Sequence, residues 1–482
     1  MNVSHRPVLS HFGRLERLAR RLLESQDRSG DAAWRLERHI IRLQLSIQAA
    51  RSKRLDRADQ FGERIRSLQT ERPAGWKYKI GRCQRALERV RVEAESLQDC
   101  LNLARSVGDA FAWIMFRGNE RNLHPLTEND RVPAPVTGPE LEAILDFAVL
   151  QWRAGLGFPV LHDMTHCLRV GDVSFVRRGQ QPVTFEIKDS VLDAGPDCTY
   201  RQLTVRAVLS KAQAERVRSA IPAGTYGDGP PLQPRIRLDA RERRQWERME
   251  IAAARTQAEV SAPAVINGSP EYTIVVPDLE QAHNWEAAAV VIQKARTEGY
   301  GVATVDDVSL YFAVYHPAGL GSEDGEAHLI RCVSRLADAL AETGLWDAAS
   351  ERGSLDRMKY SDHCLGETDP KLMPFLVQGL PTDAKLDFIS GRLELLVVTN
   401  VNRLLAAIDV GAEGQGIPRP SDVLRASDER LRYWLSKIAF EFMTVDGVRL
   451  ATQAMISLME SMRSTPEDLA VQRDEDSIDP SS

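Results

Sequence analysis

The chain has 482 residues, of which 43% are hydrophobic and 27% charged, and its formal net charge is −6. This length exceeds one compact core, so we expect two or three domains of a globular protein. No apolar run approaches the roughly 20 residues of a membrane helix, and the N-terminus lacks the apolar core of a signal peptide. Because the six cysteines form no CxxC pair, we expect reduced thiols in a cytoplasmic protein without membrane association.

The charge is distributed unevenly along the chain. Residues 1–120 hold 24 Lys and Arg against 15 Asp and Glu, whereas the remainder is acidic. A basic segment on an acidic body suggests an anionic partner for that segment, and an Arg-rich solvated helix surface is the alternative.

The spacing predicts helices over residues 10–115, with apolar residues at i, i+3 and i+4 and a turn at residues 73–81. We expect a helical hairpin or short bundle as a first domain, residues 1–122. Its densest basic patch, a predicted nucleic-acid-binding surface, consists of Arg51, Lys53, Arg54 and Arg57. Alternatively, an apolar stripe with Leu43 and Ile47 forms a homo-oligomer or binds a partner protein.

Residues 123–137 are Pro-rich and polar and predict a linker. A helix follows with clear start signals. Thr137 suits the N-cap, Pro139 the first turn, and Glu140 completes a capping box with Thr137.

The next elements are a short strand at residues 158–162 and a β-hairpin within residues 169–190. Residues 200–220 then predict a helix. Residues 222–270 read as an insertion that holds a charged helix, and residues 271–277 as a buried strand. These elements form an expected second domain over residues 138–300.

Residues 301–464 alternate helical and strand patterns and predict a C-terminal α/β region. Residues 465–482 are acidic and poor in apolar side chains, which indicates a disordered tail.

Two acids and a lysine share one face of the predicted hairpin. Because side chains alternate along a strand, Glu186 and Lys188 lie together, and Asp172 on the neighbouring strand can approach Glu186. Two carboxylates at one place repel each other unless a cation is present. Hard oxygen ligands of this kind suit Mg²⁺ or Mn²⁺.

Lys188 is unusual for this chain, which has 10 lysines against 52 arginines and only this Glu-x-Lys. A compact ammonium group can approach a metal-bound water or a scissile phosphate. The alternative is an ordinary exposed Glu/Lys pair on a strand. The pair His162 and His166 lacks the Glu of a zinc-binding HExxH helix.

The order helix, strand, strand with Asp, turn, strand with Glu-x-Lys, helix resembles the core of the PD-(D/E)XK nuclease superfamily, the restriction-endonuclease-like fold. Gly171-Asp172 and Glu186-Ile187-Lys188 match its motif. The stretch from Gly138 to Glu142 is similar to a helix opening in which that Glu joins the metal site. The resemblance covers roughly residues 136–220.

This resemblance implies an α+β protein with an αβββαβ core between the helical hairpin and the α/β region. Asp172 and Glu186 would hold Mg²⁺ or Mn²⁺, Lys188 would act on the attacking water, and Glu142 would orient a water or second ion. Gln202 and Arg206, on one face of the helix after the hairpin, would contact nucleic acid.

The implied reaction is hydrolysis of phosphodiester bonds. DNA is the expected substrate because most relatives of this core cut DNA, in defence against foreign DNA or in repair. The alternative is a catalytically inactive nuclease-like subunit that acts as a nucleic-acid-binding or assembly module through residues 1–120.

Overall fold

The computed structural model describes residues 6–24, 30–116, 123, 126, 137–177, 180–193, 199–207, 240–257, 264–266, 269–271, 283–345, 355–360, 372–410 and 418–463. The chain divides into two compact units. The first consists of residues 1–273, 361–378 and 385–390, and the second of residues 274–360, 379–384 and 391–482. The described part is mixed α+β and mostly helical, with two four-stranded antiparallel sheets.

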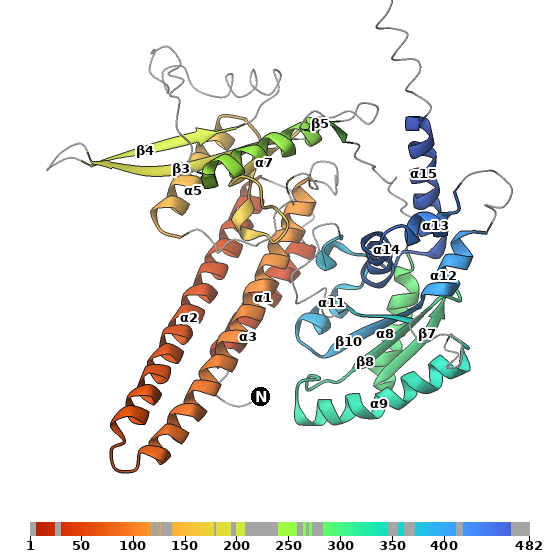
Figure 1. The fold of residues 1–482 in the computed structure, drawn as a ribbon, viewed down its shortest axis with the longest axis horizontal. Helices are drawn as coiled ribbons and strands as arrows, with labels where there is room; N and C mark the ends of the chain where they lie inside the picture. Colours follow the sequence, from red (N-terminus) through yellow and green to blue (C-terminus); the bar gives the residue numbers. More distant parts are fainter. Residues whose placement is uncertain are drawn as a thin grey trace, which may run out of the picture. The chain divides into compact units, whose positions relative to one another are not determined.

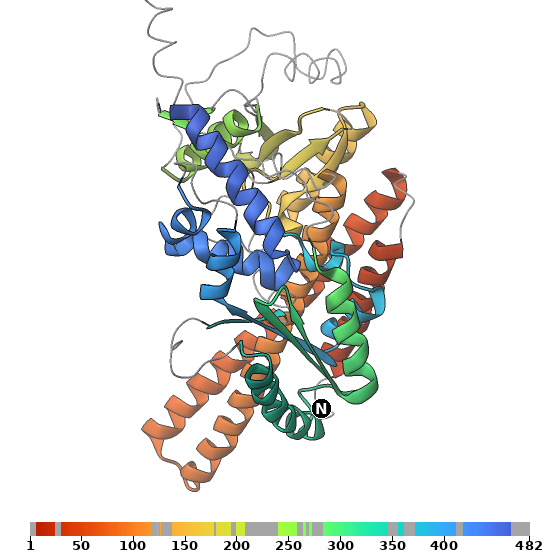
Figure 2. The ribbon, with the colours of Figure 1, turned by 90° about the vertical axis from the view of Figure 1, so that its right-hand side faces the viewer.

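The first unit begins with helices α1 (Arg6–Glu24), α2 (Gly30–Glu71) and α3 (Trp76–Phe116). Helices α2 and α3 run side by side as a long hairpin in both views (Figures 1 and 2). The expected helical hairpin is therefore confirmed. Leu43 and Ile47 are buried within this chain, so its own fold already covers the apolar stripe.

A four-stranded sheet follows the hairpin in the same unit. Its elements are α5 (Pro139–Arg153), β1 (Phe158–Leu161), the 3₁₀ turn η3 (His162–Met164), β2 (Val173–Val176), β3 (Val183–Asp193) and β4 (Thr199–Arg206). The strand order is β1-β2-β3-β4. Phe147 of α5 packs edge-on against Phe175 and Phe185, with ring centroids 6.1 and 5.4 Å away. The order α5, β1, β2, β3 agrees with the sequence-based expectation.

The expected helix over residues 200–220 is wrong in its described part. Residues 199–206 form β4, which pairs along its whole length with β3, from Glu186↔Arg206 to Asp193↔Thr199. Tyr200, Leu203 and Ala207 fit a helix period, whereas Leu203 and Val205 fit a strand period of two, and cross-strand pairing decides between them. Residues 208–221 lie outside the described part of the chain.

The predicted capping box at the start of α5 is also wrong. The N-cap is Gly138, with a φ of 68° and no side-chain cap hydrogen bond, and Pro139 occupies the first helical turn. A positive φ is readily adopted only by glycine. Thr137 therefore stands one position too early to cap the helix.

The insertion contributes α7 (Ala240–Gln257), which is the charged helix expected there, and a small hairpin of β5 (Ala264–Ile266) and β6 (Ser269–Glu271). Most of the expected linker, most of the strand expected at residues 271–277 and the acidic tail at residues 465–482 lie outside the described residues. Leu123 and Leu126, within that linker, are buried.

The second unit contains an antiparallel sheet of order β7-β8-β10-β9. Its elements are α8 (Trp285–Glu298), β7 (Tyr300–Val305), β8 (Ser309–Tyr315), α9 (Glu323–Glu342), β9 (Leu355–Lys359), β10 (Leu393–Asn400), α12 (Val401–Ile408), α13 (Pro420–Arg425), α14 (Asp428–Glu441) and α15 (Val445–Arg463). Two short elements, η4 (Phe375–Val377) and α11 (Thr382–Ile389), fall between β9 and β10 in the sequence. Because every strand pair is antiparallel, this region is α+β, not the α/β arrangement expected.

Along β8, alternate side chains serve two layers. Phe312 and Val314 pack with Cys332 of α9, whereas Tyr311 meets the ring of Phe442. Among the residues that the structure describes, no helix combines the length and apolar composition of a membrane span.

Substitutions at two helical glycines can test how closely α3 approaches the loop at Met164. A Cβ on Gly108 would overlap the Met164 carbonyl oxygen, whereas a Cβ on Gly62 of α2 would have no neighbour within 4 Å. We expect Gly108→Ala to lower the free energy of unfolding by about 1–3 kcal/mol through overpacking. Gly62→Ala should raise it by up to about 1 kcal/mol because alanine is the better helix former. Thermal melts of both variants check this, and a stable Gly108→Ala protein would contradict the described packing.

Candidate functional site

Asp172 lies beside Glu186 at the start of the β2–β3 pair. The register pairs Val173 with Phe185, and Asp172 directly precedes this pair on one strand while Glu186 directly follows it on the other. The Asp172 amide donates to the Phe185 carbonyl at 2.8 Å, and Asp172 Oδ2 accepts a hydrogen bond from the Ile187 amide at 2.5 Å. Asp172 therefore binds the backbone on both sides of Glu186, which fixes the two carboxyl-bearing residues next to each other.

Gly171 makes this approach possible. Its φ is 77°, and a Cβ there would lie 2.6 Å from Thr184 Cγ2 and 3.0 Å from the Phe185 carbonyl oxygen. A larger residue would meet both a conformational penalty and a steric clash. The Gly-Asp pair of the motif thus has a local structural cause.

A buried polar layer continues along the same face of the sheet. His162 Nε2 and Ser174 Oγ are 2.8 Å apart, and Ser174 Oγ and Thr184 Oγ1 are 2.7 Å apart. Burial lowers the pKa of His162 to about 4, so its ring is neutral at physiological pH. Glu186, two residues after Thr184, is 4% exposed and belongs to this layer.

The ladder between β3 and β4 brings further predicted residues to this face. Arg206 stands opposite Glu186, Thr204 opposite Lys188, and Gln202 opposite Ser190. Directly opposed residues of an antiparallel pair share a face. Positions 186, 188, 202 and 206 therefore form one set, although Gln202 and Arg206 come from a strand and not from the expected helix.

Glu142 lies near the start of α5. It is exposed on α5, as is Glu140. Within the described ranges, no group of three or more His, Cys, Asp or Glu residues is arranged to hold a metal ion. The structure brings together Asp172 and Glu186 and adds no third acid to them there.

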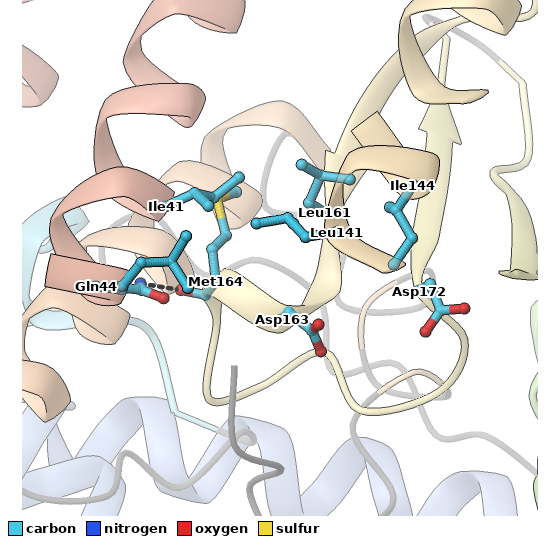
Figure 3. A pocket seen from close by; sticks show the side chains of 9 residues that line it. Ile41, Gln44, Leu141, Ile144, Leu161, Asp163, Met164 and Asp172 are labelled. Carbon is cyan, nitrogen blue, oxygen red and sulfur yellow. Dashed lines mark hydrogen bonds between the residues drawn. The ribbon is translucent and has the colours of Figure 1, made fainter. Parts of the chain in front are cut away.

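A small cavity adjoins Asp172, with a volume of about 20 Å³, enough for one water molecule. Its lining is mostly apolar, and two carboxylates, Asp163 and Asp172, stand at it (Figure 3). Ile41 and Gln44 of α2 and Leu141 of α5 form part of its wall. The N-terminal helices thus contribute directly to the surroundings of Asp172.

Helix α2 holds this region through two buried polar side chains. Glu37 Oε1 accepts a hydrogen bond from the Leu161 amide at 2.7 Å. Gln44 Nε2 donates to the Met164 carbonyl at 2.8 Å and to the Ala104 carbonyl at 3.1 Å. Burial raises the pKa of Glu37 well above that of an ordinary carboxyl, and the bond from Leu161 offsets only part of this.

Helix α3 holds the next residues of the segment through Asp109. Its Oδ1 accepts hydrogen bonds from the amides of His166 and Cys167 at 2.7 and 2.9 Å, and its Oδ2 lies 2.9 Å from His166 Nδ1. Burial would raise the pKa of Asp109, but the charge of His166 and these hydrogen bonds lower it below its ordinary value. His162 and His166 thus face different partners and do not form a metal-binding pair with each other.

Sequence reasoning missed Glu37, Gln44, Asp109 and Asp163. A signal existed for two of them, because Glu37 and Gln44 interrupt the apolar stripe of α2 seven residues apart. A polar residue in such a stripe is buried only with a partner. That partner is the backbone of a segment more than 100 residues away, which the spacing does not identify.

Comparisons of the chain with protein-family models, curated proteins and solved structures found no match.

The raised pKa of Glu37 predicts a pH-dependent stability. A carboxyl whose folded pKa is raised costs stability as pH rises from about 4.3 through the folded pKa, because the unfolded chain ionises first. Glu37→Gln keeps an oxygen that can accept from the Leu161 amide and removes the titration. We expect the variant to melt at or above the wild-type temperature near pH 8, and the difference to shrink towards about pH 5. Exposed Glu88→Gln is the control, and a Glu37→Gln protein that melts lower only at high pH would contradict the assignment.

Proposed function

We propose that this protein is a metal-dependent nuclease that hydrolyses phosphodiester bonds, with DNA as substrate. The observation that carries the proposal is the adjoining position of Asp172 and Glu186, with Lys188 two residues further along the same strand. Helix α5 and the three strands β1, β2 and β3 that follow it support the resemblance to the PD-(D/E)XK superfamily. The role in defence against foreign DNA or in repair is part of the same proposal.

The donor chemistry fits a hard divalent cation. Mg²⁺ is commonly held by one or two carboxylates together with waters and substrate phosphates. Asp172 and Glu186 supply two such carboxylates at opposed positions, with Mn²⁺ as the alternative ion. When bound, the ion would acidify a water and stabilise charge on the phosphate.

The residues around this pair have distinct roles in the proposal. The Ile187 amide holds the Asp172 carboxylate in place, and the neutral His162–Ser174–Thr184 layer shields Glu186 from bulk water. Lys188 positions the attacking water or takes up its proton. Arg206 and Gln202, on the same face by register, supply a cation and a hydrogen-bonding group for the nucleic acid.

A second candidate function has its own support. Glu186 is 96% buried, and no third acid among the described residues joins the pair. A nuclease-like core without activity, in a protein that binds nucleic acid or a partner through the N-terminal helices, would also have these features. Cleavage of a plasmid in Mg²⁺ and its loss in EDTA distinguishes the two.

The proposal predicts which side chains the cleavage requires. Asp172→Asn and Glu186→Gln keep shape and remove a charge, so each should reduce Mg²⁺-dependent cleavage by at least about 100-fold with the fold intact. Lys188→Arg should lose a similar factor because a planar guanidinium cannot replace a compact ammonium. Plasmid nicking rates and circular dichroism measure both effects.

Two exposed acids of α5 serve as a matched pair in that experiment. Asp146→Asn should cleave like the wild type, since Asp146 is exposed one helical turn beyond Glu142 and has no role in the proposal. Glu142→Gln tests whether Glu142 takes part at all. Full activity of the Asp172 and Glu186 variants would refute the nuclease proposal.

A further inference from the structure

The charge of the N-terminal helices is concentrated at one end of the hairpin. Residues 51–91, which form the turn and the adjoining halves of α2 and α3, hold 13 Lys and Arg against five Asp and Glu. Figure 1 shows this end lying away from the four-stranded sheet of the same unit. The contacts of α2 and α3 with the sheet segment, through Glu37, Gln44 and Asp109, are all in the other half. Among the described residues, the basic end therefore makes none of these contacts to the sheet.

A row of exposed side chains follows α3 from the turn. Tyr78, Arg82, Arg85 and Arg89 recur at intervals of four, three and four residues, which places them on one stripe of the helix. All four are exposed, and Tyr78 is 68% exposed. The stripe contains three cations and no acid.

Helix α2 carries a second row, Lys53, Arg57 and Arg64, also exposed. The acids of this part of α2, Asp56, Asp59 and Glu63, flank this row, about 80–140° from its centre at 100° per residue. Of the basic patch expected from the sequence, Lys53 and Arg57 belong to this row. Arg51 and Arg54 are half-buried, and Arg54 Nε is bonded to Glu93 of α3 at 2.6 Å.

The two rows lie on the same side of the hairpin. The buried positions Ala58 and Leu68 on α2, and Ile80 and Val90 on α3, define the faces that meet. Measured from these faces, the row on α2 precedes the contact by about 80° and the row on α3 by about 150°. Both rows are displaced from the contact face in the same rotational sense about their own helix axes. Because the two helices are antiparallel, this places both rows on the same side of the hairpin. None of the six cations forms an ion pair in the described part of the chain.

We propose that this basic side, defined as Lys53, Arg57, Arg64, Tyr78, Arg82, Arg85 and Arg89, binds the phosphate backbone of duplex nucleic acid without reading its sequence. The inference rests on the proposed function only in taking nucleic acid as the partner. The row on α3 is about 17 Å long at 1.5 Å per residue. Over that length a duplex presents about ten phosphates, one per 1.7 Å. All six cations can therefore find a phosphate, and the Tyr78 hydroxyl can donate to another.

An anionic membrane surface is a poorer match for this side. Membrane-surface helices place large apolar side chains next to their cations. Here Ala58, Leu68, Ile80 and Val90 are buried, and the exposed apolar residues Leu55 and Val92 occur singly and form no apolar face. Vesicles nevertheless serve as one arm of the test.

The test is fluorescence anisotropy of a labelled 30-base-pair duplex with the full chain in EDTA, so that cleavage plays no part. Six phosphate contacts predict a slope of about −5 in a plot of log affinity against log salt. The triple variant Arg82→Gln, Arg85→Gln, Arg89→Gln should reduce the slope to about −3 and weaken binding to any duplex sequence.

The hairpin offers a control with the same change of charge. Arg66, Lys77 and Arg91 are exposed on the other side, and their triple replacement by Gln should leave the slope near the wild-type value. Equal losses in both triple variants would overturn the proposal, because net charge and not this side would then control binding. Binding only to vesicles containing phosphatidylserine, or no effect of the first variant, would overturn it as well.

This outcome is separate from the nuclease proposal. Binding without any Mg²⁺-dependent cleavage would support the basic side and refute the nuclease. The opposite result is Mg²⁺-dependent cleavage by the triple variant of Arg82, Arg85 and Arg89 with duplex binding unchanged. It would support the nuclease and refute the basic side.

Discussion

The buried contact between Asp109 and the segment at His166 is the interaction on which the first unit depends. One carboxylate accepts two backbone amides and faces the His166 ring, all at a depth where both side chains are 1% exposed. A buried charge is stable only when it is paired and hydrogen-bonded, and these contacts meet both needs. Because the buried carboxylate needs these partners, it holds helix α3 against the short loop at His166 in one defined geometry.

The consequences of this contact extend to the candidate site. The loop that Asp109 holds begins at His162, whose amide donates to the Asp172 carbonyl at 3.0 Å. Asp172 in turn binds the amide of Ile187, next to Glu186. Three successive contacts therefore connect α3 with the pair of carboxylates. The N-terminal helices and the sheet, expected as separate domains, share one compact unit. The halves of α2 and α3 nearer the sheet support the candidate site, and the far half of the hairpin carries the exposed cations.

Sequence reasoning succeeded where one local pattern determines the structure. The helical hairpin, the strand pair around Gly171-Asp172 and the element order up to β3 all follow from periodicity and a turn. It failed at residues 199–206, where Tyr200 and Leu203 fit a helix period, Leu203 and Val205 fit a strand period, and only pairing with β3 decides. It also failed at Thr137, because the positive φ of Gly138 moves the start of α5 by one residue. Asp109 could not be assigned, since its partners lie 57 and 58 residues away.

Hydrogen exchange of the amides, followed by mass spectrometry in the wild type and in Asp109→Asn, tests the central claim most directly. That claim is that the helices and the acidic strand pair form one cooperative unit. Asparagine keeps an oxygen for the two amides but loses the charge that faces His166. We expect faster exchange both in residues 162–168 and at Asp172 and Ile187, because these amides lie on one chain of contacts. Faster exchange confined to residues 162–168, with Asp172 and Ile187 as protected as in the wild type, would contradict it.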